Sequence, residues 1–428
     1  MSTGFDRDRG EFTRGARAVV VLPDQGDGAR DAEARLAETA GLAAAIGVSV
    51  VEHIAYRVRA PKPATLIGSG QVEQLGAQMR VAEAGLVVFD ASLTPVQQRN
   101  LETALEAKVI DRTGLILEIF GERAATAEGR LQVELAHLDY QAGRLVRSWT
   151  HLERQRGGFG FLGGPGETQI EADRRLIRDR MARLRRELDQ VSRTRGLHRD
   201  RRRRAPWPVI ALVGYTNAGK STLFNHLTGA SVMAEDVLFA TLDPTLRQVS
   251  LPGIEKAILS DTVGFVSELP TQLVAAFKAT LEEVVSADLL IHVRDIAHPD
   301  SIAQKDDVEG VLNDIGVDAS VPRIEAWNKL DLLDAEEREE MLGEAARRDD
   351  VVALSALRGE GVSTLLETIA ALLTTAHRRY TITLDAGDGA GAAWLHAHGE
   401  VLGQAVEGDI ATYDVRMALR DFERFGTR

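Results

Sequence analysis

The sequence predicts an α/β protein of several units, and three observations support this. Short β-branched runs alternate with helical patterns over the first 120 residues, and a second alternation runs from Val209 to about Thr375, as in sheets covered by helices. Between them the apolar period changes to that of a helical hairpin. A chain of 428 residues is also too long for one hydrophobic core. We therefore expect four units: residues 1–120, 121–200, 205–375 and 376–428.

The first unit is predicted to be a small parallel sheet with helices. The expected strands are residues 18–22, 48–55, 86–90 and 109–111, and the expected helices are residues 30–45, 71–84 and 94–107. Strict alternation of the two kinds of element favours parallel pairing. Thr94 followed by Pro95 is typical of an N-cap and the first helical position.

The second unit is predicted to be an antiparallel helical hairpin. Apolar residues recur in steps of three and four in two runs: Leu131, Leu135, Leu138, Ala142 and Leu145, then Ile170, Ile177, Met181, Leu184, Leu188 and Val191. Such heptad seams pack helix against helix. The glycine-rich residues 156–166 between the runs then form the tip of the hairpin.

Prolines separate the later units. The segment 201–208 ends in Ala-Pro-Trp-Pro, which stops a helix and is typical of a linker. After His377 a short tail with strand-like residues 380–384 and 410–417 is expected to be a small α/β unit.

The charge distribution indicates one dedicated anionic partner. The net charge of the whole chain is −13, yet residues 151–204 hold 16 Arg and no Lys against 8 acidic residues, a local charge of +8. The net charge alone argues against a nucleic-acid partner, but a basic arm on an acidic body favours one dedicated anionic partner over general adhesion. Cysteine is absent, which excludes disulfides and thiolate metal sites. With neither a signal-peptide core nor an apolar run of membrane-spanning length, we expect a cytoplasmic protein.

A complete P-loop follows the apolar strand 209–213. It consists of Gly214, Tyr215, Thr216, Asn217, Ala218, Gly219, Lys220 and Ser221, and a helix is expected from Thr222 onward. Glycines let backbone N–H groups surround phosphates, the lysine reaches the β- and γ-phosphates, and the serine ligates magnesium. The motif alone does not separate ATP from GTP.

A second motif favours guanine. Asn328, Lys329, Leu330 and Asp331 resemble the NKxD element of GTPases, in which the Asp carboxylate accepts hydrogen bonds from guanine N1 and N2. Adenine offers no matching pair of donors. Ser355, Ala356 and Leu357, after a buried run, resemble the loop that flanks the base.

Two further segments resemble the switches of a GTPase. Asp261, Thr262, Val263 and Gly264 match DxxG, and residues 239–245 would be switch I, with Phe239, Ala240, Thr241, Leu242 and Asp243 near the nucleotide. Magnesium is expected on Ser221, Thr241 and Asp261, and the γ-phosphate on the N–H of Gly264. Together these motifs predict a P-loop GTPase domain beside the N-terminal α/β domain with its hairpin and the small C-terminal α/β domain.

Hydrolysis needs some group other than the usual glutamine. Position 265 is Phe, where signalling GTPases carry a water-orienting Gln, so slow intrinsic turnover is expected. Asn217 stands where potassium-activated GTPases place an Asn ligand. A bound K⁺ there and a merely structural Asn are both open. The expected catalytic groups are Lys220, Thr241, Gly264 and Asn217.

Several segments outside this domain resemble the HflX family of ribosome-associated GTPases. They are residues 88–90, 93–102, Asp111-Arg112-Thr113, 129–135 and the loop 163–168, and with the P-loop and the Phe after DxxG they extend the resemblance over nearly the whole chain. The resemblance implies GTP and GDP as ligands, and the large ribosomal subunit and its rRNA as partners. The hairpin tip would face the peptidyl transferase region, with a role in splitting stalled ribosomes or in ribosome biogenesis.

The residues themselves agree with an RNA partner, because arginines of the second hairpin helix supply phosphate contacts and Phe159 and Phe161 offer faces to unpaired bases. We expect a monomer without a membrane span. Two alternatives remain: an RNA-modification GTPase, which would need a cofactor site, and a regulatory GTP-binding module with little hydrolysis.

Overall fold

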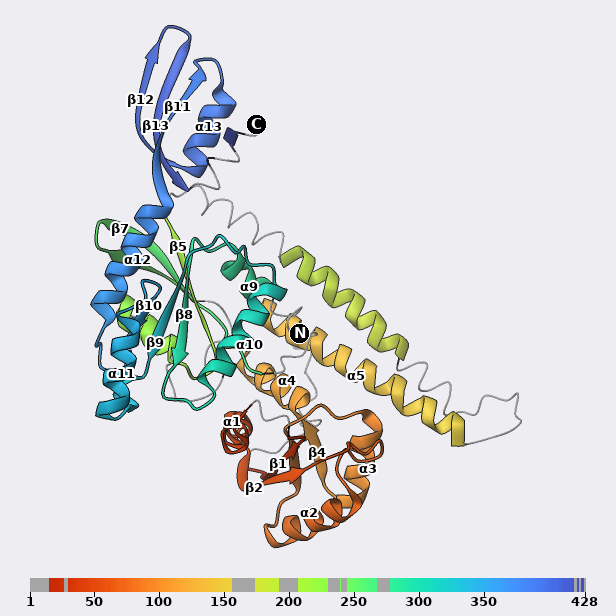
Figure 1. The fold of residues 1–428 in the computed structure, drawn as a ribbon. Coiled ribbons are helices and arrows are strands. Elements are labelled where there is room, and N and C mark those ends of the chain that lie inside the picture. The colour runs from red at the N-terminus through yellow and green to blue at the C-terminus, as the bar shows by residue number, and fades with distance from the viewer. Residues whose placement is uncertain are drawn as a thin grey trace.

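The computed structural model describes residues 15–26, 30–155, 174–191, 207–229, 239, 245–267, 278–418, 422 and 425–426. Three separate sheets lie along the molecule (Figure 1), and they belong to an N-terminal, a central and a C-terminal unit. This arrangement confirms the predicted α/β fold class. No helix in these ranges is long and apolar enough to span a membrane.

The N-terminal sheet is parallel, as predicted. Its strands are β1 (Arg17–Asp24), β2 (Ser49–Arg57), β3 (Leu86–Phe89) and β4 (Lys108–Asp111), in the order β2-β1-β3-β4. Helices α1 (Ala32–Ala45), α2 (Ser69–Val81) and α3 (Pro95–Leu105) connect them. The Thr94 hydroxyl accepts a hydrogen bond from the Gln97 N–H at the start of α3, which is the expected N-cap.

One helix of this unit was not predicted. Helix α4 (Arg112–Arg123) follows β4 directly, and its N-cap Asp111 accepts from the Gly114 N–H at 2.8 Å. Seven of its residues are buried, so it lies between other elements rather than on a surface. This helix connects the sheet to the hairpin.

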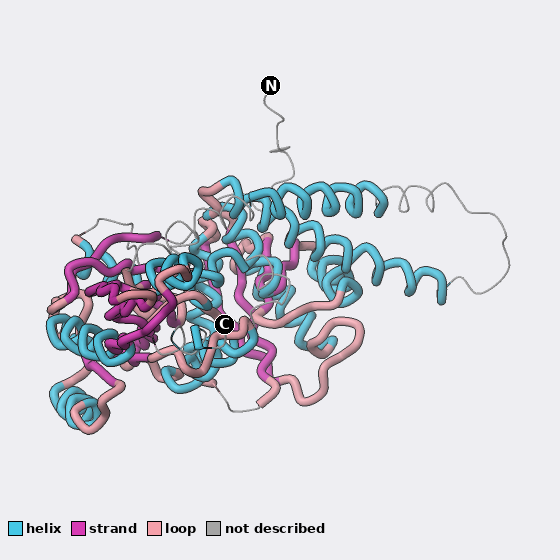
Figure 2. Tube along the Cα trace, turned by 90° about the horizontal axis from the view of Figure 1, so that it is seen from above, coloured by secondary structure: helices cyan, strands magenta, loops and turns pink. Residues whose placement is uncertain are grey.

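The hairpin forms as the heptad pattern predicted. Helix α5 (Ala127–Gln155) and a helix over residues 174–191 run side by side (Figures 1 and 2). Arg180 of the second helix donates two hydrogen bonds, of 2.6 and 2.9 Å, to Glu134 of α5, and Met181 and Leu184 are buried. The glycine-rich residues 156–166, together with the loop 163–168, lie outside the described residues.

The central sheet has six strands, of which one is antiparallel. In spatial order they are β10 (Val351–Ala353), β9 (Arg323–Asn328), β8 (Leu289–Asp295), β5 (Val209–Gly214), β7 (Ile254–Asp261) and β6 (Thr245–Leu251). Its helices are α7 (Lys220–Thr228), α9 (Lys278–Val285), α10 (Ser301–Asp314), α11 (Ala335–Ala345) and α12 (Val362–Ala376). Thr245, placed by sequence in switch I, begins β6, which pairs antiparallel with β7.

The C-terminal unit is larger than the two strands expected from sequence. It holds β11 (His377–Asp385), α13 (Gly389–His398), β12 (Glu400–Glu407) and β13 (Ile410–Ala418), with sheet order β11-β13-β12. Strands β11 and β12 both pair antiparallel with β13. The buried residues of this sheet pack with Leu395 of α13.

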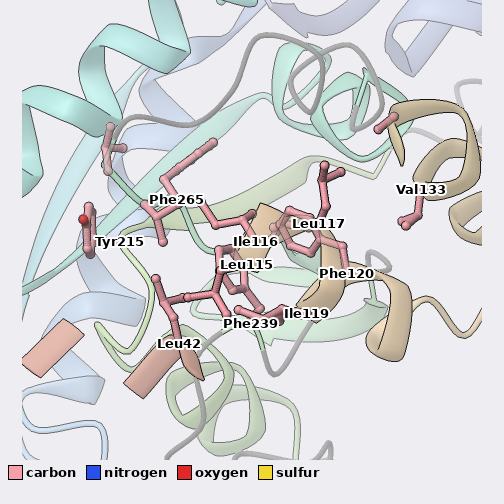
Figure 3. Close-up of a cluster of buried hydrophobic side chains, with 14 of the residues drawn as sticks. Leu42, Leu115, Ile116, Leu117, Ile119, Phe120, Val133, Tyr215, Phe239 and Phe265 are labelled. Atoms are coloured by element: carbon pink, nitrogen blue, oxygen red, sulfur yellow. The ribbon is translucent and has the colours of Figure 1, made fainter. Parts of the chain in front are cut away.

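The N-terminal and central units share one hydrophobic core. Leu115, Ile116 and Phe120 of α4 lie in the same buried cluster as Phe239 and Phe265 of the central unit (Figure 3). The rings of Phe120 and Phe239 meet edge to face, with centroids 4.6 Å apart, a favourable aromatic geometry. The two units are therefore packed on each other through α4.

Phe120→Ala is expected to weaken this shared core. The ring is fully buried, so the change leaves a cavity and should lower the free energy of unfolding by about 3–5 kcal/mol. Urea denaturation followed by tryptophan fluorescence measures the loss. Val81→Ala is the control, because Val81 is 88% exposed and its loss should cost less than about 0.5 kcal/mol. Equal stability of the two variants would contradict the shared core.

Candidate nucleotide-binding site

The P-loop is folded tightly against its neighbours. Gly214 has φ +150°, and a Cβ there would lie 2.2 Å from the carbonyl oxygen of Val293 on β8. Gly219 has φ +94°, and a Cβ there would lie 2.2 Å from Nδ2 of Asn328. Only glycine fits positions with a positive φ and such close approach. The loop then enters α7, whose N-terminal N–H groups attract anions.

Lys220 is buried inside this loop. Its Nζ donates to the Tyr215 carbonyl oxygen at 2.7 Å. Burial lowers the pKa of Lys220 to about 8, and the nearby Asp261 carboxylate offsets only part of that effect. The site thus holds a poorly compensated cation, which an incoming phosphate would stabilise.

The DxxG segment lies against the P-loop. The Ser221 hydroxyl donates to Oδ2 of Asp261 at 2.8 Å, and Asp261 is fully buried at the end of β7. The Thr262 hydroxyl donates to the Leu212 carbonyl oxygen of β5. At Gly264 a Cβ would lie 2.9 Å from Cα of Thr216 and 3.0 Å from Nζ of Lys220. The glycine backbone therefore reaches the lysine that the motif assigns to phosphate.

The side-chain amide of Asn328 joins the P-loop, the NKxD loop and residues 355–357. Nδ2 of Asn328 donates to the Ala218 carbonyl oxygen at 2.8 Å, and its Oδ1 accepts from the Ala356 N–H at 2.8 Å. The Ser355 hydroxyl donates to Oδ1 of Asp331 at 2.5 Å. These bonds bring together the P-loop, the NKxD residues and residues 355–357, although Asn328 and Ala218 are 110 positions apart in the sequence.

A cluster of charged side chains surrounds Glu325 of β9, the strand that leads into the NKxD loop. The Glu325 carboxylate accepts from Arg294, Lys305 and the Trp327 indole. Burial opposes its ionisation, but these hydrogen bonds lower the pKa of Glu325 to about 2. Asn328 follows Trp327 directly, so the cluster fixes the strand end from which the base loop starts.

The structure places the other predicted residues with mixed results. Asn217 is exposed, with a left-handed backbone at φ 58°. Lys329 also has a left-handed backbone, at φ 71°, but it is only partly exposed, and its Nζ pairs with Asp295 at 2.7 Å. Leu330 is buried and Leu357 is 75% exposed. The predicted contacts at Ala240, Thr241, Leu242 and Asp243 lie outside the described residues.

Two predicted nucleotide contacts turn their side chains elsewhere. The Phe239 ring packs on Phe120 of α4, and the Tyr215 hydroxyl donates to Glu38 of α1 at 3.0 Å. At Tyr215 only the backbone carbonyl joins the cradle, through Lys220. Both side chains are buried and contact residues of the N-terminal unit. They therefore contribute to the packing of the central unit on the N-terminal unit.

Sequence reasoning missed the partners on the N-terminal side. Glu38 and Arg112 approach the P-loop region although they lie far from it in the chain. No local motif marks Glu38. Arg112 belongs to Asp111-Arg112-Thr113, a segment that resembles the HflX family, but the resemblance did not indicate what Arg112 does.

Four family models match in succession. They are described as GTP-binding GTPase N-terminal (residues 33–121), GTP-binding GTPase Middle Region (123–202), 50S ribosome-binding GTPase (209–329) and HflX C-terminal domain (340–426). Together they cover most of the chain. The GTPase match includes the P-loop and the beginning of the base loop.

Curated relatives named GTPase HflX agree over most of their length. The protein of Magnetococcus marinus is 49% identical over 94% of this chain and 92% of its own. That of Escherichia coli is 45% identical over 83% and 82%, and that of Caldanaerobacter subterraneus 46% over 82% and 78%. Similarity at this level extends from the N-terminal sheet to the base loop and beyond, and the chain belongs to the HflX family of GTPases, which bind and hydrolyse GTP.

Proposed function

We propose that this GTPase binds the large ribosomal subunit through its helical hairpin and couples GTP hydrolysis to translation, in ribosome splitting or rescue under stress or in ribosome biogenesis. The observation that carries the proposal is a group of five exposed arginines on the second hairpin helix. They are Arg175, Arg178, Arg183, Arg185 and Arg186. Exposed arginines of this kind neutralise phosphates of RNA. The model matched by residues 209–329 is itself described as a ribosome-binding GTPase.

Magnesium fits the oxygen donors at the start of α7. The hydroxyl of Ser221 and the carboxylate of Asp261 are hard ligands lying 2.8 Å apart, and Mg²⁺ is commonly held by one or two such groups plus nucleotide phosphates. We propose Ser221 and Asp261 as its ligands, joined by Thr241. The ion would neutralise charge on the β- and γ-phosphates.

The protein groups then divide the work of hydrolysis. Lys220 binds the β- and γ-phosphates, the Gly264 N–H faces the γ-phosphate, and Asp331 with Asn328 selects guanine. Phe265 is buried and offers no hydrogen bond to water. We propose that a K⁺ ion held by Asn217 supplies positive charge in the transition state. We further propose a cytoplasmic monomer whose functional units are residues 1–120, 121–200, 205–375 and 376–428.

Asp331→Asn should change the base that the site prefers. An amide cannot accept from both guanine N1 and N2, but it can donate to the oxygen that replaces the amino group in xanthine. We expect GTP affinity to fall about a hundredfold or more and xanthosine triphosphate affinity to rise, measured by competition against a fluorescent nucleotide. Asp334→Asn is the matched control, because Asp334 only caps α11 and Asn caps equally well. Unchanged GTP affinity in Asp331→Asn would refute the assignment.

Turnover should depend on the monovalent cation. We expect several-fold faster GTP hydrolysis in KCl than in NaCl at equal ionic strength, since the proposed ion stabilises transition-state charge. Asn217→Ala should abolish the difference and leave GDP affinity within about threefold. Equal rates of the unmodified protein in both salts would remove the cation from the mechanism.

Hairpin variants test the ribosomal partner. Basal turnover should be low and should rise with the concentration of large ribosomal subunits. Combining Arg183→Glu, Arg185→Glu and Arg186→Glu should raise the subunit concentration needed for half-maximal stimulation. It should also reduce the slope of log affinity against log salt concentration by about one unit per lost phosphate contact. Replacing residues 157–166 by a neutral linker should keep basal turnover but reduce stimulation.

Exposed arginines of the N-terminal unit provide the control. Arg80→Glu and Arg99→Glu reverse the same charge on helices α2 and α3 and should be stimulated normally. If the hairpin variants are stimulated like the unmodified protein at two salt concentrations, the hairpin is not the contact with the ribosome.

A further inference from the structure

A buried arginine joins the N-terminal unit to the segment after DxxG. Arg112 is the first residue of α4 and only 3% exposed. Its guanidinium forms ion pairs with Glu38 of α1 and with Asp90. On the other side it donates to Oγ of Ser267 at 2.6 Å and to the Ser267 carbonyl oxygen at 3.3 Å. Burial disfavours the charged guanidinium, but the two carboxylates outweigh this and raise the pKa of Arg112 above its ordinary value.

Tyr215 of the P-loop also forms a hydrogen bond with Ser267. The Ser267 N–H donates to the Tyr215 hydroxyl oxygen at 2.7 Å, and that hydroxyl donates to Glu38. Burial and the Glu38 charge raise the pKa of Tyr215 to about 12, so the hydroxyl keeps its proton. Ser267 is thus held at its nitrogen, its carbonyl oxygen and its hydroxyl by residues of the two units.

Ser267 lies three residues after the DxxG glycine, at the far end of a short segment. Phe265 is bonded to the P-loop on both sides: its N–H donates to the Gly214 carbonyl oxygen at 3.1 Å, and its own carbonyl oxygen accepts from the Thr216 N–H at 2.7 Å. Gly264, one residue earlier, borders Lys220. The short segment 264–267 is therefore fixed at one end by the P-loop and at the other by Arg112 and Tyr215.

The residue before Arg112 faces the hairpin. Oδ1 of Asp111 accepts from the Tyr140 hydroxyl at 2.6 Å, and Oδ2 accepts from Arg144 at 2.8 Å. Tyr140 and Arg144 belong to α5. Two adjacent residues at the start of α4 thus contact the hairpin and the segment after DxxG.

We propose that Arg112 is a positioning residue for GTP hydrolysis, which holds residues 264–267 so that the Gly264 N–H stays directed at the phosphate site. The inference rests on the role proposed above for the Gly264 N–H, but it concerns the free enzyme and needs no ribosome. Without Arg112 the Ser267 end of the segment loses two of the hydrogen bonds that hold it, so that end must be ordered again during each turnover at a cost in backbone entropy. That cost falls on the rate rather than on nucleotide binding, since the P-loop and base loop keep their contacts.

The test is hydrolysis by the full chain under single-turnover conditions. Arg112→Gln should lower the rate constant about tenfold, equivalent to about 1.4 kcal/mol, with KM and GDP affinity within about threefold. Arg112→Lys should recover part of the rate, because it keeps the charge but not the planar fork that spans the carboxylates and Ser267. Ser267→Ala removes one acceptor and should lower the rate about threefold. Combined with Arg112→Gln it should add little, as expected for residues in contact.

Arg35→Gln is the matched control. Arg35 also pairs with Asp90, at 2.9 Å, and within the described residues its guanidinium donates hydrogen bonds to Asp90 alone. This variant should lose stability comparably yet hydrolyse GTP at the normal rate. An unchanged or faster rate in Arg112→Gln, an equal slowing in Arg35→Gln, or a parallel loss of GDP binding would each overturn the proposal. If Arg112→Gln fails to fold, Ser267→Ala and Arg112→Lys decide the matter through the same rate constant.

Discussion

Helix α4 is the element that makes one body of the two larger units, because it is buried by both. Its apolar residues share a core with Phe239 and Phe265, and its first residue places a guanidinium in that junction. Removing a charge from water is costly unless every partner is in place. Glu38 and Asp90 supply compensation from one unit, and Ser267 supplies acceptors from the other. The two units are therefore held in one relative arrangement by packing and by a buried ion cluster together.

The loops of the nucleotide site are likewise held together by a few hydrogen bonds between distant parts of the chain. Asn328 satisfies both ends of its amide with backbone groups of two other loops, and the glycines allow those loops to approach closely. Contacts that already exist without a ligand lower the cost of ordering these loops when a ligand binds. Lys220 is the exception, since its buried charge remains poorly compensated until phosphate arrives. The loops around Asn328 are thus closely bonded to one another, whereas the charge of Lys220 is only partly compensated.

Contiguous motifs made the P-loop, DxxG and NKxD segments predictable, because their chemistry requires particular residues at fixed spacing. Helix α4 was not predicted, although its buried Leu115, Ile116, Ile119 and Phe120 recur at helical spacing, because it begins directly after β4 with no turn residue between the two elements. Strand β12 was also not predicted, because most of its residues are exposed and its sequence therefore shows no alternation of buried and exposed residues. The contacts of Glu38 with Tyr215 and of Arg112 with Ser267 span 177 and 155 positions, a distance at which a single sequence carries no signal.

The attachment of Asp111 to the middle of α5 gives the hairpin the mechanics of a lever. Helix α5 continues about 15 residues beyond Tyr140 to Gln155, or roughly 22 Å at 1.5 Å per residue. A swing of about 10° around that fulcrum moves the far end by roughly 4 Å, while the anchored end shifts by much less.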